Sequence, residues 1–173
     1  IAWHAGQSNW NKKNSLNGNS IGIEISNKGH QLGYQKYSKV QIQSLINLSK
    51  FLIKKYNIKK SNILGHSDIA FDRKKDPGEN FPWKLLASEG IGIWHNINQK
   101  KLRKFRKQKI YPKDKRKIKH FFRKIGYFTN NISRRSYTKL TKSFQRRFRQ
   151  ELVNGNIDKE CMIIAEKLSK LYS

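Results

Sequence analysis

Apolar residues recur at helical spacing after residue 38. Ser38, followed three residues later by Gln41, is typical of a capping box, in which the two side chains satisfy backbone N–H groups at the start of a helix. The apolar pattern ends near Asn57. The spacing predicts an amphipathic helix between these points, with its apolar positions at Val40, Ile42, Leu45, Ile46, Leu48, Phe51, Leu52 and Tyr56.

A second pattern, strict alternation, occupies residues 20–25. Ile21, Ile23 and Ile25 point to one side of an extended chain, and Gly22 and Glu24 point to the other. This alternation predicts a strand with one apolar face. Glu24 faces either solvent or a functional site, and the pattern alone leaves both possibilities open.

The C-terminal part of the chain shows three further helical patterns. Residues 96–112 have few apolar positions and indicate a basic linker that ends at Pro112. We therefore expect a mixed region over 1–95, this linker over 96–112 and a helical domain over 113–173. The apolar positions of the three expected helices are Ile118, Phe121, Phe122 and Ile125, then Leu140, Phe144 and Phe148, then Met162, Ile163, Leu168 and Leu171.

Charge changes the picture of possible partners. The formal net charge is +27, and residues 96–150 hold 21 Lys or Arg residues against one acid, Asp114. Such an excess attracts polyanions, so nucleic acid, an anionic membrane and an anionic cell-wall polymer are all candidates. A tract of about 20 apolar residues, as a transmembrane helix needs, is absent from the sequence.

Two smaller features bear on processing and compartment. The single cysteine, Cys161, excludes an intrachain disulfide and lies in an apolar stretch, so we expect a buried thiol. The chain begins at Ile1 rather than Met. We therefore expect the natural N-terminus, with any export signal or lipid anchor, to lie upstream.

Candidate chemistry is concentrated in residues 65–78. A short apolar run at 62–65 predicts a buried strand entering a turn, the position where open α/β sheets place their sites. His66 follows it, and Lys74 and Asp76 precede a Pro-Gly turn. Imidazole and carboxylate are zinc ligands, and a catalytic zinc has three protein ligands and an open position. His66 and Asp76 would supply two of them, although a loop His and a turn Asp at this spacing are usually only solvated.

Four motifs together resemble the zinc-dependent N-acetylmuramoyl-L-alanine amidases, the family that includes phage lysozyme-type amidases and peptidoglycan recognition proteins. The resemblance is strongest to its envelope-anchored Gram-negative subgroup, which carries a C-terminal peptidoglycan-binding-like domain. The motifs are Ala2-Trp3-His4-Ala5-Gly6, Leu16-Asn17 with Ser20-Ile21-Gly22-Ile23-Glu24, Gly65-His66-Ser67-Asp68-Ile69-Ala70, and Arg73-Lys74-Lys75-Asp76-Pro77-Gly78.

The resemblance implies an α/β fold in which a mixed central β-sheet is flanked by helices and followed by a small three-helix C-terminal domain. It implies zinc as cofactor, with His66 and Asp76 as metal ligands, Glu24 as the acid–base group and Lys74 as the oxyanion-stabilising group. The residues expected to contact substrate are Trp3, His4 and Asn17.

The implied reaction is hydrolysis of the amide bond between N-acetylmuramic acid and L-Ala in peptidoglycan, in the periplasm or cell envelope. One departure stands out, because the family's first zinc ligand is a His upstream of the Ala-Trp-His-Ala-Gly motif, where this chain starts. A catalytically inactive peptidoglycan-binding remnant is therefore an alternative. A nucleic-acid-binding protein is the weaker alternative, because the C-terminal aromatics fall at core spacing and the sequence has no helix-turn-helix, zinc-finger or aromatic ribonucleoprotein signature.

Overall fold

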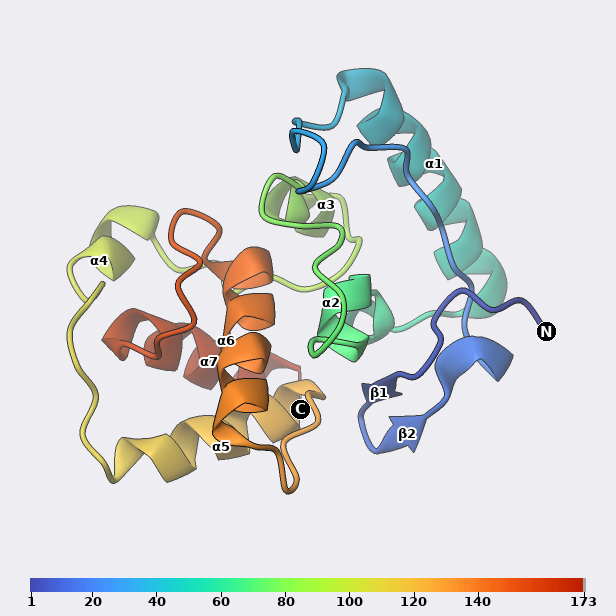
Figure 1. Ribbon diagram of the computed structural model, residues 1–173. Helices are drawn as coiled ribbons and strands as arrows, with labels where there is room; N and C mark the ends of the chain where they lie inside the picture. Colours follow the sequence, from blue (N-terminus) through green and yellow to red (C-terminus); the bar gives the residue numbers. More distant parts are fainter. Residues whose placement is uncertain (173) are drawn as a thin grey trace.

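The computed structural model describes residues 1–172 as seven α-helices and one small two-stranded sheet. Figure 1 shows the C-terminal helices gathered on one side and the longest helix on the other, with two short helices between them. The helices are α1 (Lys39–Tyr56), α2 (His66–Ile69), α3 (Trp83–Ser88), α4 (Gln99–Arg103), α5 (Asp114–Ile125), α6 (Arg134–Phe148) and α7 (Lys159–Leu171).

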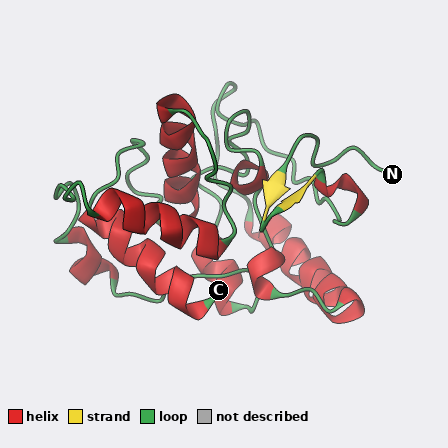
Figure 2. Ribbon diagram, turned by 90° about the horizontal axis from the view of Figure 1, so that it is seen from below, coloured by secondary structure: helices red, strands yellow, loops and turns green. Residues whose placement is uncertain are grey.

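The sheet consists of β1 (Asn9–Trp10) and β2 (Lys13–Asn14), which pair antiparallel. Figure 2 shows that loops make up most of the remaining N-terminal chain. Two 3₁₀ turns, Leu16–Gly18 and Lys60–Asn62, complete the regular structure. The mixed α/β class is confirmed, with a sheet smaller than the sequence predicted.

The strands predicted at 20–25 and 62–65 do not form. A strand needs a neighbour to satisfy its backbone N–H and C=O groups, and no described segment pairs with either run. Ile21 and Ile23 accordingly remain 51% and 41% exposed. The Ile63 carbonyl accepts a hydrogen bond from the Arg147 side chain instead, at 2.8 Å.

The predicted boundaries of helix α1 are confirmed. Ser38 caps the helix by accepting a hydrogen bond from the Gln41 backbone N–H, and the Gln41 side chain accepts one from the Ser38 N–H. Asn57 ends it in the left-handed region, at φ 51°. The apolar stripe is only partly covered, because Val40 and Phe51 stay 77% and 59% exposed.

One hydrophobic core joins all three predicted regions. It includes Trp10 of β1, Trp83 of α3 and Leu102 of α4 together with the apolar faces of α5, α6 and α7. The segment predicted as a linker is packed rather than free, since Arg106 also forms an ion pair with buried Glu160 of α7. The predicted domain boundaries stay a prediction.

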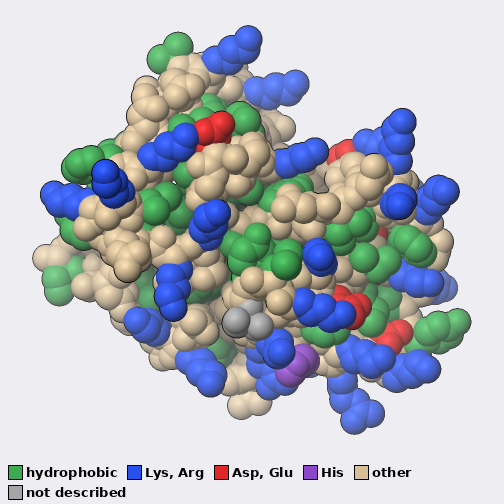
Figure 3. Space-filling view, turned by 180° about the vertical axis from the view of Figure 1, so that it is seen from behind, with side chains coloured by type: hydrophobic (Ala, Val, Ile, Leu, Met, Phe, Trp, Pro, Cys, Tyr) green, Lys and Arg blue, Asp and Glu red, His purple; other side chains and the backbone are tan. Residues whose placement is uncertain are grey.

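Two surface properties complete the fold. Lys and Arg side chains are spread over the face shown in Figure 3, with few acidic side chains among them. Within residues 1–172, none of the helices has the length and apolar character needed to span a membrane.

Candidate functional site

The structure brings His66 and Asp76 together. His66 is the first residue of α2, and Asp76 lies in the loop that connects α2 to α3. Their side-chain atoms Nδ1 and Oδ2 are 3.0 Å apart. The loop is tied to the helix by the backbone as well, because the Ser67 N–H donates to the Asp76 carbonyl at 2.8 Å.

The other ring nitrogen of His66 determines what the pair can hold. Nε2 lies 3.3 Å from the Ala5 carbonyl oxygen. When Nε2–H donates to this carbonyl, Nδ1 turns its lone pair toward the Asp76 carboxylate. Two electron-pair donors at this separation repel one another unless a proton or a metal cation lies between them.

The pair fits a zinc ion as two of its ligands. Ligands bonded to tetrahedral zinc at about 2.0–2.1 Å are about 3.3 Å from one another, close to the observed His66–Asp76 separation of 3.0 Å. A backbone carbonyl is one of the common partners of the second ring nitrogen of a metal-bound His, beside carboxylate and water. Among residues 1–172, no cluster of three or more His, Cys, Asp or Glu side chains completes a metal site.

Asp76 is electrostatically suited to remain ionised. Burial raises its pKa, but the hydrogen bond and charge of His66, with a smaller contribution from the nearby Lys74 charge, outweigh it and lower the pKa overall. The half-buried Lys74 therefore lies within electrostatic reach of Asp76. His66 and Asp76 are in direct contact, and the role of Lys74 stays a prediction.

Two tyrosines fix the turn that follows Asp76. The hydroxyls of Tyr34 and Tyr37 both donate to the Pro77 carbonyl, at 2.5 and 2.9 Å. Burial raises the pKa of each tyrosine, so both stay protonated donors. A Cβ on Gly78, which has φ 84°, would lie 2.5 Å from the Tyr34 hydroxyl. The close approach therefore requires glycine.

The opposite wall of the site is the segment Ala5–Gln7, which side chains hold in place. Asn17 Oδ1 accepts hydrogen bonds from the backbone N–H groups of Ala5 and Gly6, at 2.8 and 3.1 Å. Arg73 donates to the Ala5 and Gln7 carbonyls, at 2.6 and 2.8 Å. A substrate-binding role was predicted for Asn17 and none for Arg73, although Arg73 belongs to the fourth motif.

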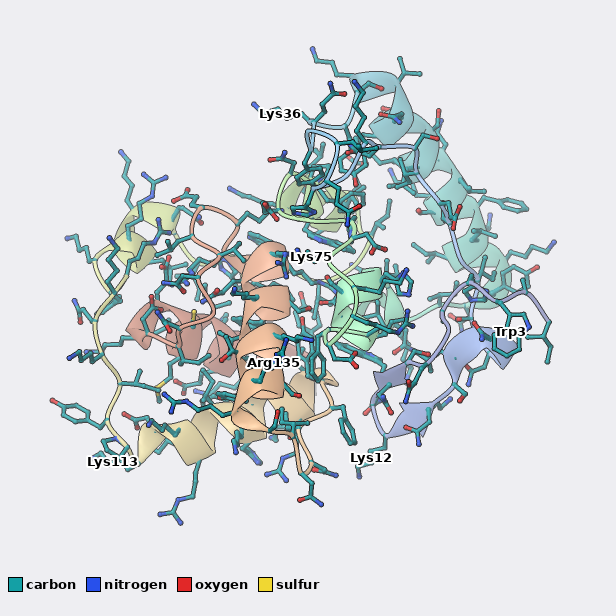
Figure 4. The ribbon with its side chains drawn as sticks, in the orientation of Figure 1. Trp3, Lys12, Lys36, Lys75, Lys113 and Arg135 are labelled. Atoms are coloured by element: carbon teal, nitrogen blue, oxygen red, sulfur yellow. The ribbon has the colours of Figure 1, made fainter. Side chains whose placement is uncertain are left out.

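The remaining predicted site residues are His4, Trp3 and Glu24. His4 Nε2 is 2.8 Å from the Ser20 hydroxyl, and its side chain lies against Gly22. Trp3 is 87% exposed and extends from the margin of the molecule (Figure 4). Glu24 is exposed, and within the described chain no hydrogen bond or ion pair joins its carboxylate to His66, Asp76 or Lys74. The roles of these three residues stay predictions.

Three histidines, His30, His95 and His120, match none of the motifs, and a histidine outside a site is usually at the surface. His120 is exposed, and so is His30, whose ring pairs with Glu79. His95 differs from both. His95 is fully buried and stacked on Trp94, and burial lowers its pKa to about 4. The adjacent Trp94 was the available signal for a buried position.

Known proteins resemble this chain in sequence and in fold. Residues 1–79 match the family described as N-acetylmuramoyl-L-alanine amidase. The chain is 37% identical to N-acetylmuramoyl-L-alanine amidase AmiD of Escherichia coli over 99% of its own length and 64% of that relative. It is 39% identical to 1,6-anhydro-N-acetylmuramyl-L-alanine amidase AmpD of Haemophilus influenzae, over 50% of this chain and 46% of that relative.

The structural likeness extends over nearly the whole chain. A solved complex of E. coli AmiD with the substrate anhydro-N-acetylmuramic acid-L-Ala-D-gamma-Glu-L-Lys superposes with a TM-score of 0.84 at 36% identity. The superposition covers 99% of this chain and 69% of that one. The chain thus spans about two thirds of AmiD, and it belongs to the N-acetylmuramoyl-L-alanine amidase family.

Proposed function

We propose that this protein hydrolyses the amide bond between N-acetylmuramic acid and L-Ala in peptidoglycan. The proposal rests on the pair of candidate metal-ligand atoms, His66 Nδ1 and Asp76 Oδ2, which are 3.0 Å apart. Both His66 and Asp76 lie within residues 1–79, the part of the chain that matches the amidase family. The products are a glycan that bears N-acetylmuramic acid and a peptide that begins with L-Ala.

His66 and Asp76 are proposed to hold zinc, which when bound acidifies water and polarises a carbonyl group. Glu24 is assigned to accept a proton from the attacking water and to return it to the leaving amine of L-Ala. The Lys74 ammonium, which lies within electrostatic reach of Asp76, is suited to the negative charge that develops on the carbonyl oxygen.

The ligand named in the solved AmiD complex supports a muropeptide as the substrate class. The net charge of +27 favours association with an anionic wall, and residues 113–173 are proposed to contribute to this binding. The corresponding location is the cell envelope, where peptidoglycan lies.

The test is a product assay on purified peptidoglycan and on anhydro-N-acetylmuramyl tripeptide, with zinc and with a chelator. We expect peptides with a free N-terminal L-Ala, and their loss in His66→Ala and Asp76→Ala. His120→Ala is the matched control, because His120 is exposed on α5. Hydrolysis that survives in both ligand variants would refute the assigned site.

Binding without hydrolysis is the second candidate, favoured by the presence of two rather than three clustered ligands among residues 1–172. It predicts retention on insoluble peptidoglycan with no released peptide. Retention through charge weakens with salt, since exposed charges are screened beyond about 10 Å at 0.1 M. Competition by DNA at equal salt distinguishes wall binding from nucleic-acid binding.

A further inference from the structure

A buried carboxylate lies directly beside the proposed metal pair. Asp68 of α2 is 1% exposed, two residues after His66. Its Oδ1 accepts a hydrogen bond from the Tyr127 hydroxyl at 2.6 Å, and its Oδ2 accepts one from Arg147 at 2.5 Å. Burial of a charge is costly unless it is paired and hydrogen-bonded, and both partners come from the C-terminal region.

The same carboxylate fixes the backbone on one side of His66. Asp68 Oδ2 also accepts from the Gly65 N–H at 2.8 Å. Gly65 is closely surrounded, because a Cβ there would lie 2.7 Å from Pro77 and 3.2 Å from Trp83. Displacement of Asp68 would remove its hydrogen bond to the residue that precedes His66.

The residue on the other side of His66 is held by α6. The Ser143 hydroxyl donates to the Ser67 carbonyl at 2.6 Å, while the Ser67 N–H donates to the Asp76 carbonyl at 2.8 Å. A continuous path of hydrogen bonds thus runs from α6 through Ser67 to Asp76. The path connects α6 to the residue after His66 and to Asp76.

Arg147 is the rigid part of this support. Its guanidinium bonds Asp68 and the Ile63 carbonyl at the same time, at 2.5 and 2.8 Å. It also stacks over Trp83, with 4.3 Å between the guanidinium carbon and the ring centroid. A planar guanidinium can satisfy these contacts together, whereas a lysine ammonium cannot.

We propose that Arg147, Tyr127 and Ser143 are positioning residues that hold the His66–Asp76 pair in metal-binding geometry through Asp68 and Ser67. The helical region is then part of the site's architecture in addition to any role in wall binding. The inference rests on the proposed metal role of His66 and Asp76. Neighbours that orient metal ligands typically contribute 10- to 100-fold in metal affinity.

The test compares zinc affinity of the full chain and its variants, by competition with a chelating dye well below the unfolding temperature. We expect Tyr127→Phe to weaken zinc binding roughly 10-fold and Arg147→Lys up to about 100-fold. Tyr137→Phe is the matched control, because among residues 1–172 its buried hydroxyl has no hydrogen-bond partner. Ile118→Val, in the core of α5, controls for a loss of stability alone.

A second readout needs no metal. The ¹H–¹⁵N signals of the His66 ring, assigned with His66→Gln, should shift or broaden in Tyr127→Phe and Arg147→Lys and stay unchanged in both controls. Failure of the wild-type protein to bind zinc would refute the metal role. The ring signals would then still test whether Tyr127 and Arg147 position His66. Unchanged ring signals in both variants would overturn the inference. If the wild-type protein binds zinc, an equal zinc affinity in both variants would overturn it as well.

Discussion

The two ends of the molecule differ in how they are held together. In the C-terminal region, α5, α6 and α7 bury Phe122, Phe144 and Leu168 completely. In the first region, α1 leaves Val40 and Phe51 largely exposed, and the regular structure before it consists of two two-residue strands and one 3₁₀ turn. The C-terminal region is stabilised by apolar packing, whereas hydrogen bonds from side chains to the backbone hold much of the first.

This difference indicates which part of the molecule keeps the site rigid. His66 lies in a helix of four residues and Asp76 lies in the loop that follows it. Elements of this kind provide little stiffness alone. The Asp68 and Ser67 contacts attach this weak framework to α6. The candidate catalytic residues and their mechanical support therefore come from different regions of the chain.

The largest expected effect separates chemistry from stability. Glu24→Gln should lower kcat by about 10²–10⁴-fold, the usual contribution of a proton-transferring group, and leave the unfolding midpoint unchanged because Glu24 is exposed. Steady-state kinetics and thermal unfolding measure the two quantities. Glu89→Gln is the control, in the exposed Lys50–Glu89 ion pair. An unchanged kcat would remove Glu24 from the mechanism.

The next effect compares one aromatic residue in each region. Phe144→Ala should lower the free energy of unfolding by about 3–5 kcal/mol, as removal of a buried Phe does, because Phe144 is 0% exposed. Phe51→Ala, at 59% exposure, should change it by less than about 0.5 kcal/mol. Urea unfolding measures both. Equal losses would contradict the contrast in packing.

The third effect is a loss of stability in acid. It arises from His95, which stacks on Trp94 of the core that joins the regions. The pKa of His95 falls from 6.5 to about 4 because the residue is buried. The unfolded chain therefore takes up the proton first, and stability falls as pH decreases from about 6.5 toward 4. At 1.36 kcal/mol per pKa unit, the loss approaches about 3 kcal/mol.

His95→Asn isolates this contribution, because the amide oxygen can replace Nδ1 as acceptor of the Ile97 N–H. We expect urea unfolding of this variant to show a pH dependence weaker by about 2–3 kcal/mol between pH 7 and pH 4. An identical pH dependence in wild type and variant would show that His95 does not titrate differently on folding.

The smallest effect compares two helix caps. Ser38 caps α1 and Ser133 caps α6, and replacement of such a residue by Ala typically costs about 1 kcal/mol. Because one core joins the regions, we expect both variants to lower the global free energy of unfolding. Hydrogen exchange provides the check. Faster exchange confined to α1 in Ser38→Ala would divide the molecule into separate folding units.

Local patterns predicted four of the seven helices, α1, α5, α6 and α7, and missed the short helices α2, α3 and α4. The Ser38–Gln41 capping box and the apolar spacing of α5, α6 and α7 depend on residues close in sequence. The motif at 65–78 likewise identified His66 and Asp76, because a short loop brings them together. Resemblance to a family added the roles that spacing alone left open.

Long-range pairing could not be predicted in this way. The alternation at 20–25 favours a strand, but a strand also requires a partner, and no described segment supplies one. The burial of His95 and the Asp68–Arg147 contact are decided by packing between distant segments. A polar residue on a helix carries no local sign of the carboxylate that it will meet.

The distance in sequence between Asp68 and Arg147 has a consequence during synthesis. The two residues are 79 positions apart, so at about 5–20 residues per second the ribosome needs roughly 4–16 s to add the second after the first. Throughout that interval the nascent chain carries His66 and Asp76 without their support from α6. We therefore expect ribosome-bound chains that end before α6 to expose the 65–78 loop to proteases, and the completed protein to protect it.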